Sequence, residues 1–134
     1  MRLFLDANIL FSAADPGSGM RCLLEALLER AEVLTSPHAV DEARRNLAAN
    51  HPAHLAGLEP VLNRVTISQQ FRPGLVVELP TEDLPILAGA VGSGCTHLWT
   101  GDKRHFGRWY GKSLEGVVVL DSNLIARQLL DGGW

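Results

Sequence analysis

Short runs of apolar residues, each ended by a polar or glycine-containing segment, recur along the chain and predict buried β-strands. The first covers 2–5, where Leu3, Phe4 and Leu5 follow one another until the chain turns polar at Asp6. A central strand of a parallel sheet is buried on both faces and has such a continuous apolar run. Similar runs predict further strands at 31–35, 65–67, 96–100 and 117–120.

Apolar residues with helical spacing lie between these runs. One stripe with the i, i+3, i+4, i+7 and i+8 spacing comprises Met20, Leu23, Leu24, Leu27 and Leu28. Ser18 and Ser36-Pro37 are typical helix starts, because serine caps free amide groups and proline at the first helical position loses no hydrogen bond. The pattern predicts helices at 20–28, 37–47 and 122–130. It predicts another helix that begins with a cap at Thr81 and ends at Gly92 and Gly94. Residues 50–64 are expected to be helical in pieces, interrupted around Gly57 and Pro60.

Helices that alternate with short apolar strands are typical of an α/β protein. The alternation predicts a central, mostly parallel sheet with helices on both faces, which is a three-layer α/β/α sandwich. The chain has 134 residues, and we expect residues 1–134 to form a single domain. The pattern does not decide whether the apolar residues 75–77 pair with the sheet.

Composition narrows the class of protein. The chain is 46% hydrophobic and 20% charged, and no apolar stretch reaches the roughly 20 residues of a membrane helix. Because Asp6 breaks the apolar opening and no cleavage site follows, we expect no secretory signal and a cytoplasmic protein. Cys22 and Cys95 have no partner at metal-ligand spacing, so both are expected to be buried reduced thiols.

Four acidic residues stand where an α/β fold would bring them together: Asp6, Glu42, Asp83 and Asp102. Ligands of open α/β sheets bind beyond the carboxyl ends of the strands. Crowded carboxylates repel one another unless a cation neutralises them, and oxygen ligands favour hard cations such as Mg²⁺ or Mn²⁺. The set therefore predicts metal-dependent chemistry.

The four acids differ in how they are placed. Asp6 and Asp102 directly follow predicted strands. Asp83 begins a helix, where an acid is favoured by the helix dipole whatever its function. It also lies four residues before Leu87 and so shares the inward stripe, where an unpaired acid is costly. Glu82 is turned about 100° around the helix and is expected to face solvent.

The polar neighbours of these acids leave alternatives open. Asn8 and Thr100 are candidates to orient a carboxylate by hydrogen bonds, but an ordinary turn asparagine and a strand-end threonine fit equally well. Asp41 and Glu42 are adjacent in their helix, and periodicity does not choose between them. A solvated helix face is the alternative for both.

Net charge does not decide whether the partner is a nucleic acid. The formal net charge of the chain is −3. If a metal neutralises the four acids, the net charge of the remaining residues is about +1, which no longer argues against a nucleic-acid partner. Trp109 and Tyr110 could stack on bases, although a core or interface role is favoured, and His51 and His54 are more typical of surface residues than of metal ligands. Basic residues follow two of the acids in the sequence: Lys103, Arg104 and His105 after Asp102, and Arg44 and Arg45 after Glu42. Contact with RNA phosphates and an ordinary solvated surface explain them equally well.

Four segments in the same order together resemble a PIN domain over nearly the whole chain: 3–8, 36–47, 82–90 and 98–106. The stretch Thr100-Gly101-Asp102-Lys103-Arg104-His105-Phe106 is the most specific. The resemblance implies that the catalytic, metal-binding acids are Asp6, Glu42, Asp83 and Asp102, supported by Asn8 and Thr100. It thereby favours Glu42 over Asp41. Trp99 stands where the family more often has an aliphatic residue, which affects packing and not the acids.

The resemblance also implies an activity. PIN domains are typically Mg²⁺- or Mn²⁺-dependent ribonucleases, and many are toxins of bacterial toxin-antitoxin pairs. The expected reaction is hydrolysis of RNA phosphodiester bonds by metal-activated water, with the metal also polarising the phosphoryl group. An antitoxin protein and a second copy of the chain are the protein partners that the family implies, and no membrane partner is expected.

Three other interpretations were weighed. A haloacid-dehalogenase-like phosphatase also has a strand ending in Asp, but it needs a second Asp where this chain has Asn8. A response-regulator-like domain needs an acid pair before its first helix and a lysine after a late strand, and this sequence has no convincing candidate for either. The more serious alternative is a PIN-like module that binds RNA or protein without cutting, because a complete ligand set shows capacity and not turnover.

Overall fold

A six-stranded sheet forms the centre of the structure, a computed structural model that describes residues 1–134. The strands are β1 (Arg2–Leu5), β2 (Glu32–Thr35), β3 (Thr66–Ile67), β4 (His97–Trp99), β5 (Ser113–Leu114) and β6 (Val117–Leu120). Their order across the sheet is β3-β2-β1-β4-β6-β5, and every neighbouring pair is parallel except β5 with β6.

Strand β1 lies between β2 and β4, and the side chains of its residues 3–5 are fully buried. Leu3 is opposite Val33 on one side and His97 on the other. Leu3, Phe4 and Leu5 have no exposed surface, because both faces of the strand are covered. This double burial explains the unbroken apolar run in the sequence.

Seven α-helices flank the sheet: α1 (Ala7–Ala13), α2 (Gly19–Leu28), α3 (Pro37–Asn50), α4 (Leu55–Leu62), α5 (Leu84–Gly92), α6 (Lys103–Phe106) and α7 (Ser122–Leu130). Short 3₁₀ turns cover Pro52–His54, Thr81–Asp83 and Gly107–Trp109. The predicted caps are confirmed, since the side chain of Ser18 accepts a hydrogen bond from Arg21 N and that of Ser36 accepts one from Ala39 N.

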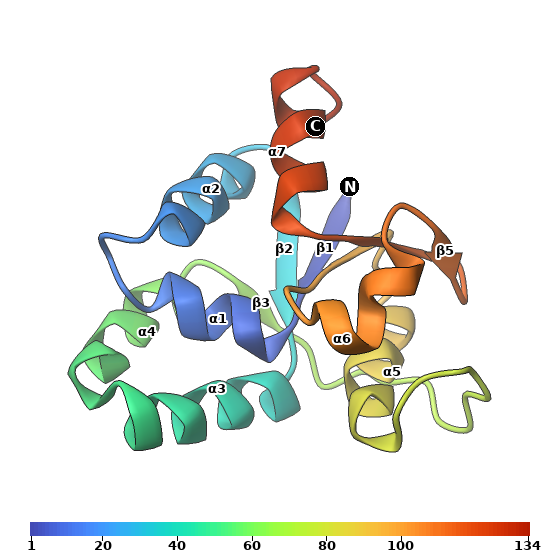
Figure 1. Cartoon of the computed structure of the whole chain (residues 1–134), viewed down its shortest axis with the longest axis horizontal. Helices are drawn as coiled ribbons and strands as arrows, with labels where there is room; N and C mark the ends of the chain where they lie inside the picture. Colours follow the sequence, from blue (N-terminus) through green and yellow to red (C-terminus); the bar gives the residue numbers. More distant parts are fainter.

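The arrangement confirms the predicted α/β class with a mostly parallel sheet. In Figure 1, β1 and β2 run downward, and α1, α3, α5 and α6 lie around the lower, carboxyl end of the sheet. Both chain termini lie at the opposite end. The carboxyl edge is therefore the edge where side chains from several elements meet.

Two helices were not predicted from the sequence. Helix α1 begins directly after Asp6, where the pattern predicted no helix, and Asp6 itself caps it by accepting from Ala7 N at 2.6 Å. Helix α6 occupies 103–106, where the pattern also predicted no helix, and Asp102 caps it by accepting from His105 N at 3.2 Å. Each is shorter than a periodic stripe needs to be visible.

Several predicted boundaries were wrong. Thr81 is not a cap, because it is the first residue of the 3₁₀ turn 81–83. The residue before this turn is Pro80, and no side chain caps the turn. The break in 50–64 falls at His51, and neither Gly57 nor Pro60 interrupts α4. Residues 75–77, for which the pattern made no prediction, form no strand. Helix α3 also continues three residues beyond Leu47.

Glycine at position 57 permits a close contact between helices. A Cβ atom there would lie 1.8 Å from the carbonyl oxygen of Ala14, at the end of α1. Arg21 joins the same two elements, since its guanidinium donates to the carbonyl oxygens of Ala13 and Gly57, both at 2.6 Å. Gly57 is therefore a packing residue and not a helix breaker.

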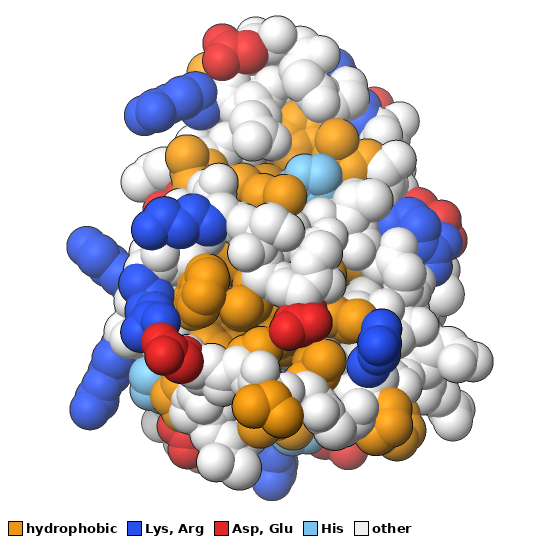
Figure 2. Space-filling view, turned by 90° about the vertical axis from the view of Figure 1, so that its right-hand side faces the viewer, with side chains coloured by type: hydrophobic (Ala, Val, Ile, Leu, Met, Phe, Trp, Pro, Cys, Tyr) orange, Lys and Arg blue, Asp and Glu red, His pale blue; other side chains and the backbone are white.

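The connection from β3 to α5 lies on the surface. Val76 is 93% exposed in it, and Phe71 is also exposed. Figure 2 faces the right-hand side of Figure 1, and hydrophobic side chains are visible there between charged ones.

One of the two thiol predictions was wrong. Cys22 is exposed, whereas Cys95 is buried as expected, and burial raises the pKa of Cys95 to about 11. A cysteine within an apolar helical stripe can still lie on its outer flank, as Cys22 does. None of the helices combines the length and apolar character needed to cross a membrane.

Candidate active site

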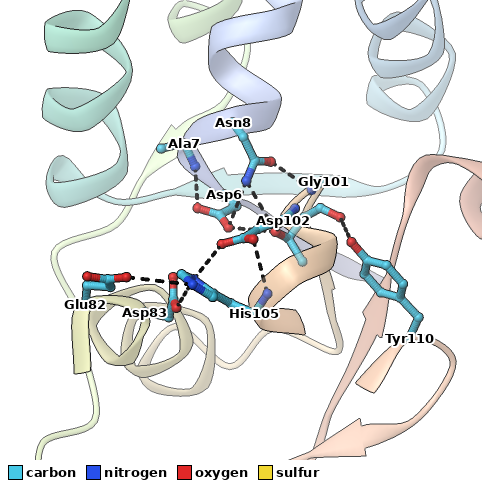
Figure 3. Close-up of polar contacts among 10 residues, drawn as sticks. Asp6, Ala7, Asn8, Glu82, Asp83, Gly101, Asp102, His105 and Tyr110 are labelled. Carbon is cyan, nitrogen blue, oxygen red and sulfur yellow. Dashed lines mark hydrogen bonds and ion pairs between the residues drawn. The ribbon is translucent and has the colours of Figure 1, made fainter. Parts of the chain in front are cut away.

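Asp6 is fixed at the carboxyl end of β1 by three donors. Its Oδ1 accepts from Ala7 N at 2.6 Å, and its Oδ2 accepts from the Thr100 hydroxyl at 2.7 Å and from Asn8 Nδ2 at 3.3 Å. The residue is 4% exposed. Figure 3 shows Ala7 and Asn8 beside the carboxylate. Because its position is set by backbone and side-chain donors together, the group is held in one orientation.

Burial raises the pKa of Asp6 from 3.8 to about 6. The hydrogen bonds from Thr100 and Ala7 oppose this increase, while the charges of Glu42 and Asp83 add to it. The carboxylate is thus costly to ionise in its place. A cation beside it would remove that cost.

Thr100 and Asn8 connect Asp6 to the residues after β4. The Thr100 hydroxyl accepts from Asp102 N at 3.1 Å while it donates to Asp6. Asn8 donates to Asp6, and its Oδ1 accepts from Gly101 N at 2.8 Å. The two polar residues that the sequence left undecided therefore both bond to groups at this site, and neither is an isolated turn or strand-end residue.

Asp83 and Asp102 both contact the His105 ring. Nδ1 of His105 lies 2.7 Å from Asp83 Oδ2 and 3.0 Å from Asp102 Oδ2, with Glu82 more distant at 3.8 Å from Nε2 (Figure 3). Asp83 is 8% exposed, and burial raises its pKa, an effect that the His105 charge opposes. Neither Asp83 Oδ2 nor His105 Nδ1 has a partner in hydrogen-bond geometry. The two atoms are thus in close contact without the geometry of a directed hydrogen bond.

The four predicted acids line one cleft. Its volume is about 370 Å³, and its walls are Asp6, Ala7, Asn8, Phe11, Ser12, Glu42, Asn46, Asn50, Asp83 and Asp102. The acids come from the end of β1, from α3, from the turn before α5 and from the segment after β4. Glu42 faces this cleft, whereas its neighbour Asp41 lines a different hollow. No packed apolar layer separates Asp83 from Asp6.

A second, overlapping group could also hold a metal ion. Ligand atoms of Glu82, Asp83 and His105 lie within 4.8 Å of one another. Asp83 belongs to both sets, so the two describe adjoining parts of one acidic region. The residues fit a cation, because Asp83 Oδ2 is a buried acceptor without a hydrogen-bond donor and Asp6 is buried with a raised pKa.

The basic residues near the acids differ in their surroundings. Lys103 and Arg104 are exposed in α6, directly after Asp102, and no ion pair occupies them. Arg44 is paired with Glu59 at 2.9 Å. Arg44 and Arg45 line the hollow that also contains Asp41, which is turned away from Glu42 on α3.

Tyr110 and Trp109 are half-buried, so their rings are not freely available to stack on nucleobases. The Tyr110 hydroxyl donates to the carbonyl oxygen of Thr100 at 3.1 Å, and burial raises the pKa of Tyr110 to about 12. Trp109 packs against the core, with the guanidinium of Arg108 5.1 Å from its ring. Trp99 is fully buried, and its Nε1 donates to the Ser122 hydroxyl at 3.0 Å. These placements support structural roles.

No protein-family model matches the sequence, and no curated protein matches it. A solved structure described as VapBC2 from Rickettsia felis bound to a DNA fragment from their promoter contains a similar chain. The TM-score is 0.66 at 18% identity, over 90% of this chain and 98% of that one.

The chain has a PIN fold. The predicted resemblance is thereby confirmed at the level of architecture. Within this PIN fold, sequence reasoning missed that His105 belongs to a group whose ligand atoms lie close enough together to hold a metal ion, since His105 was considered only as a basic neighbour of Asp102. It also missed Phe11, Asn46 and Asn50 in the cleft. The spacing of four and eight residues from Glu42 could have revealed Asn46 and Asn50, because these positions share one side of a helix.

The raised pKa of Asp6 predicts how stability of the PIN fold depends on pH. Between about pH 4 and pH 6 the folded protein holds this proton more tightly than the unfolded chain does. The free energy of unfolding is therefore expected to fall as pH rises through this range, by up to about 3 kcal/mol from this group. Urea denaturation of metal-free protein at pH 4, 5, 6 and 7 measures it, with Asp6→Asn as the control. Equal pH dependence of the two proteins would contradict the assignment to Asp6.

Proposed function

We propose that the protein is a Mg²⁺- or Mn²⁺-dependent endoribonuclease that hydrolyses RNA phosphodiester bonds. The observation that supports it most is the convergence of Asp6, Glu42, Asp83 and Asp102 on one cleft at the carboxyl edge of the sheet. Nucleases that use divalent cations need such a set of oxygen ligands. Under this proposal residues 1–134 act as one PIN-like domain.

The four carboxylates would hold the cation or cations. When bound, the metal would supply an activated water and neutralise charge on the phosphoryl group. Asp6 is the best positioned ligand, since Ala7 N, Asn8 and Thr100 fix its carboxylate. Thr100 and Asn8 are positioning residues, because each also bonds to the segment that bears Asp102.

RNA would approach over α6. Lys103 and Arg104 are exposed beside Asp102 and unpaired, so they are available to contact backbone phosphates. Arg45 and Arg44 would contact RNA that extends along α3, although Arg44 is already paired with Glu59. The acidic cleft repels phosphate when it is metal-free, so RNA binding and metal binding are expected to be coupled.

An antitoxin protein is the proposed macromolecular partner. The similar solved chain belongs to the VapBC2 structure, which was determined with a promoter DNA fragment. That likeness, together with the family resemblance, supports the assignment of this chain as the toxin of a toxin-antitoxin pair. A homodimer is proposed on the resemblance alone.

Cleavage of a fluorophore-labelled single-stranded RNA tests the proposal. We expect turnover with Mg²⁺ or Mn²⁺ and none after the metal is removed, with activity restored when either cation is returned. Calorimetric titration of Mn²⁺ checks that the protein binds the ion. If the protein binds Mn²⁺ and cuts none of a panel of RNAs, the proposal fails and the non-cutting binding module takes its place.

A further inference from the structure

The cleft extends beyond the four acids along α3. Glu42, Asn46 and Asn50 line it at intervals of four residues, which places them in a row on one side of the helix. Eight residues of helix span about 12 Å. The row thus begins at the acidic end and finishes at the carboxyl end of α3, where the walls are amide and aromatic groups.

The side chains of Asn46 and Asn50 make no hydrogen bond within the chain. No other group of the chain donates a hydrogen bond to either side-chain amide or accepts one from it. Each offers two N–H donors and one acceptor oxygen to the cleft. Both residues are exposed, and Asn50 is the last residue of α3, so their amides are open to a ligand in the cleft. They are suited to pair with a ligand that has both donors and acceptors.

Three aromatic rings form a continuous strip that begins with Phe11 in the cleft and continues outside it. Phe11 of α1 lines the cleft, and its ring meets that of His51 edge to face, with centroids 5.6 Å apart. His51 stacks on His54 at 5.4 Å with an interplanar angle of 10°. Because the two imidazoles are nearly parallel, their in-plane nitrogen lone pairs do not converge on one point, so the pair is unsuited to chelate a metal.

A flat ring with polar edges matches this combination of surfaces. Unpaired nucleobases stack on aromatic side chains and are read through hydrogen bonds to their edges. Phe11 offers apolar aromatic surface, and Asn46 and Asn50 offer the hydrogen-bonding groups. The acids at the other end of the cleft are suited to a cation-bound phosphate and not to an uncharged ring.

We propose that the Phe11, Asn46 and Asn50 end of the cleft is a subsite for one unpaired nucleobase of a single-stranded RNA. The inference rests on the proposed ribonuclease function and adds to it the way in which the substrate is bound. His51 and His54 act as positioning residues, because His51 packs against Phe11 and His54 stacks on His51. The subsite would require an unpaired base next to the scissile phosphate.

Binding of two oligonucleotides tests the subsite without reference to cleavage. One is a five-nucleotide adenosine RNA, and the other has the same sugar-phosphate backbone with abasic positions throughout. Fluorescence anisotropy is measured with Ca²⁺, which takes the same oxygen ligands as Mg²⁺, and gels check that the RNA stays intact. The wild-type protein is expected to bind the adenosine RNA about 10-fold more tightly than the abasic one.

Two variants and two matched controls identify the residues. Phe11→Leu keeps apolar bulk without the aromatic face, and Asn50→Ala changes an exposed side chain, so both are expected to fold. Each should weaken binding of the adenosine RNA about 5- to 10-fold and leave abasic binding unchanged. Phe71→Leu and Asn63→Ala, which make the same kinds of change outside the cleft, should bind both oligonucleotides as wild type does.

Three outcomes would overturn the subsite. They are equal affinity of the wild-type protein for both oligonucleotides, an equal loss for both in Phe11→Leu, and normal adenosine binding in both variants. Failure of the ribonuclease proposal looks different, since the protein would prefer the adenosine RNA and still not cut RNA with Mg²⁺ or Mn²⁺.

Discussion

The Asp102→Asn protein is expected to cleave RNA more than about 100-fold more slowly than wild type, because even the outer hydrogen-bonding partners of metal ligands are typically worth 10- to 100-fold. The change keeps the shape of the side chain and its capacity to cap α6, since the asparagine oxygen can still accept from His105 N. It removes the negative charge and replaces Oδ2, the oxygen beside His105 Nδ1, with an amide nitrogen that does not ligate a metal. Initial rates at saturating Mn²⁺ measure the effect on cleavage, and calorimetry measures Mn²⁺ affinity.

Glu82→Gln is the matched control for this prediction. Glu82 is an exposed neighbour of Asp83 and does not line the cleft, although it belongs to the group with His105. Its cleavage rate is expected to stay within about twofold of wild type, as for an ordinary surface substitution. If Glu82→Gln lost activity and Asp102→Asn kept it, the metal would belong to the Glu82, Asp83 and His105 group instead of the cleft.

The Gly57→Ala protein is expected to be less stable than wild type by about 3 kcal/mol, because a Cβ atom would meet the Ala14 carbonyl oxygen at 1.8 Å. The backbone of α4 must move away from the end of α1, which also disturbs the two hydrogen bonds donated by Arg21. The midpoint of thermal unfolding should fall by about 10 °C. Circular dichroism during heating measures it.

Gly19→Ala is the control for the glycine contact. Gly19 is the first residue of α2, and a Cβ atom there meets nothing within 4 Å. Alanine favours the helical state over glycine, so this variant is expected to be as stable as wild type or slightly more stable. Equal losses in the two variants would show that helix propensity, and not the contact with Ala14, determines the effect.

The sequence predicted the parts of the fold that depend on local pattern. The apolar run 2–5 identified the central strand, and serine caps located the starts of α2 and α3. Helix α1 was missed, because its first residue follows the strand directly and Asp6 serves both as strand end and as helix cap. Gly57 was misread for a related reason, since the sequence shows a glycine but not which carbonyl lies against it.

The candidate site was predictable only in part. The sequence located Asp6 and Asp102 through the ends of their strands, but the resemblance was needed to choose Glu42 over Asp41. The contact of His105 with Asp83 depends on how α6 packs beside the 3₁₀ turn at 81–83, which no spacing reveals. Phe11 reaches the cleft from a helix that the pattern did not predict. Side chains that converge through packing of separate elements have no signal in one sequence.

The cleft spans two regions that differ in resistance to local unfolding. Asp6 and Thr100 continue central strands, and their amides donate to Trp99 and Leu120 of the adjoining strands. Asp83 instead follows the long strandless connection from β3, which has few buried apolar residues. Segments of that kind open more readily than central strands. A ligand that contacts both the strand ends and Asp83 would therefore also stabilise the connection against local unfolding. Occupancy of the cleft and the order of this connection are thus linked.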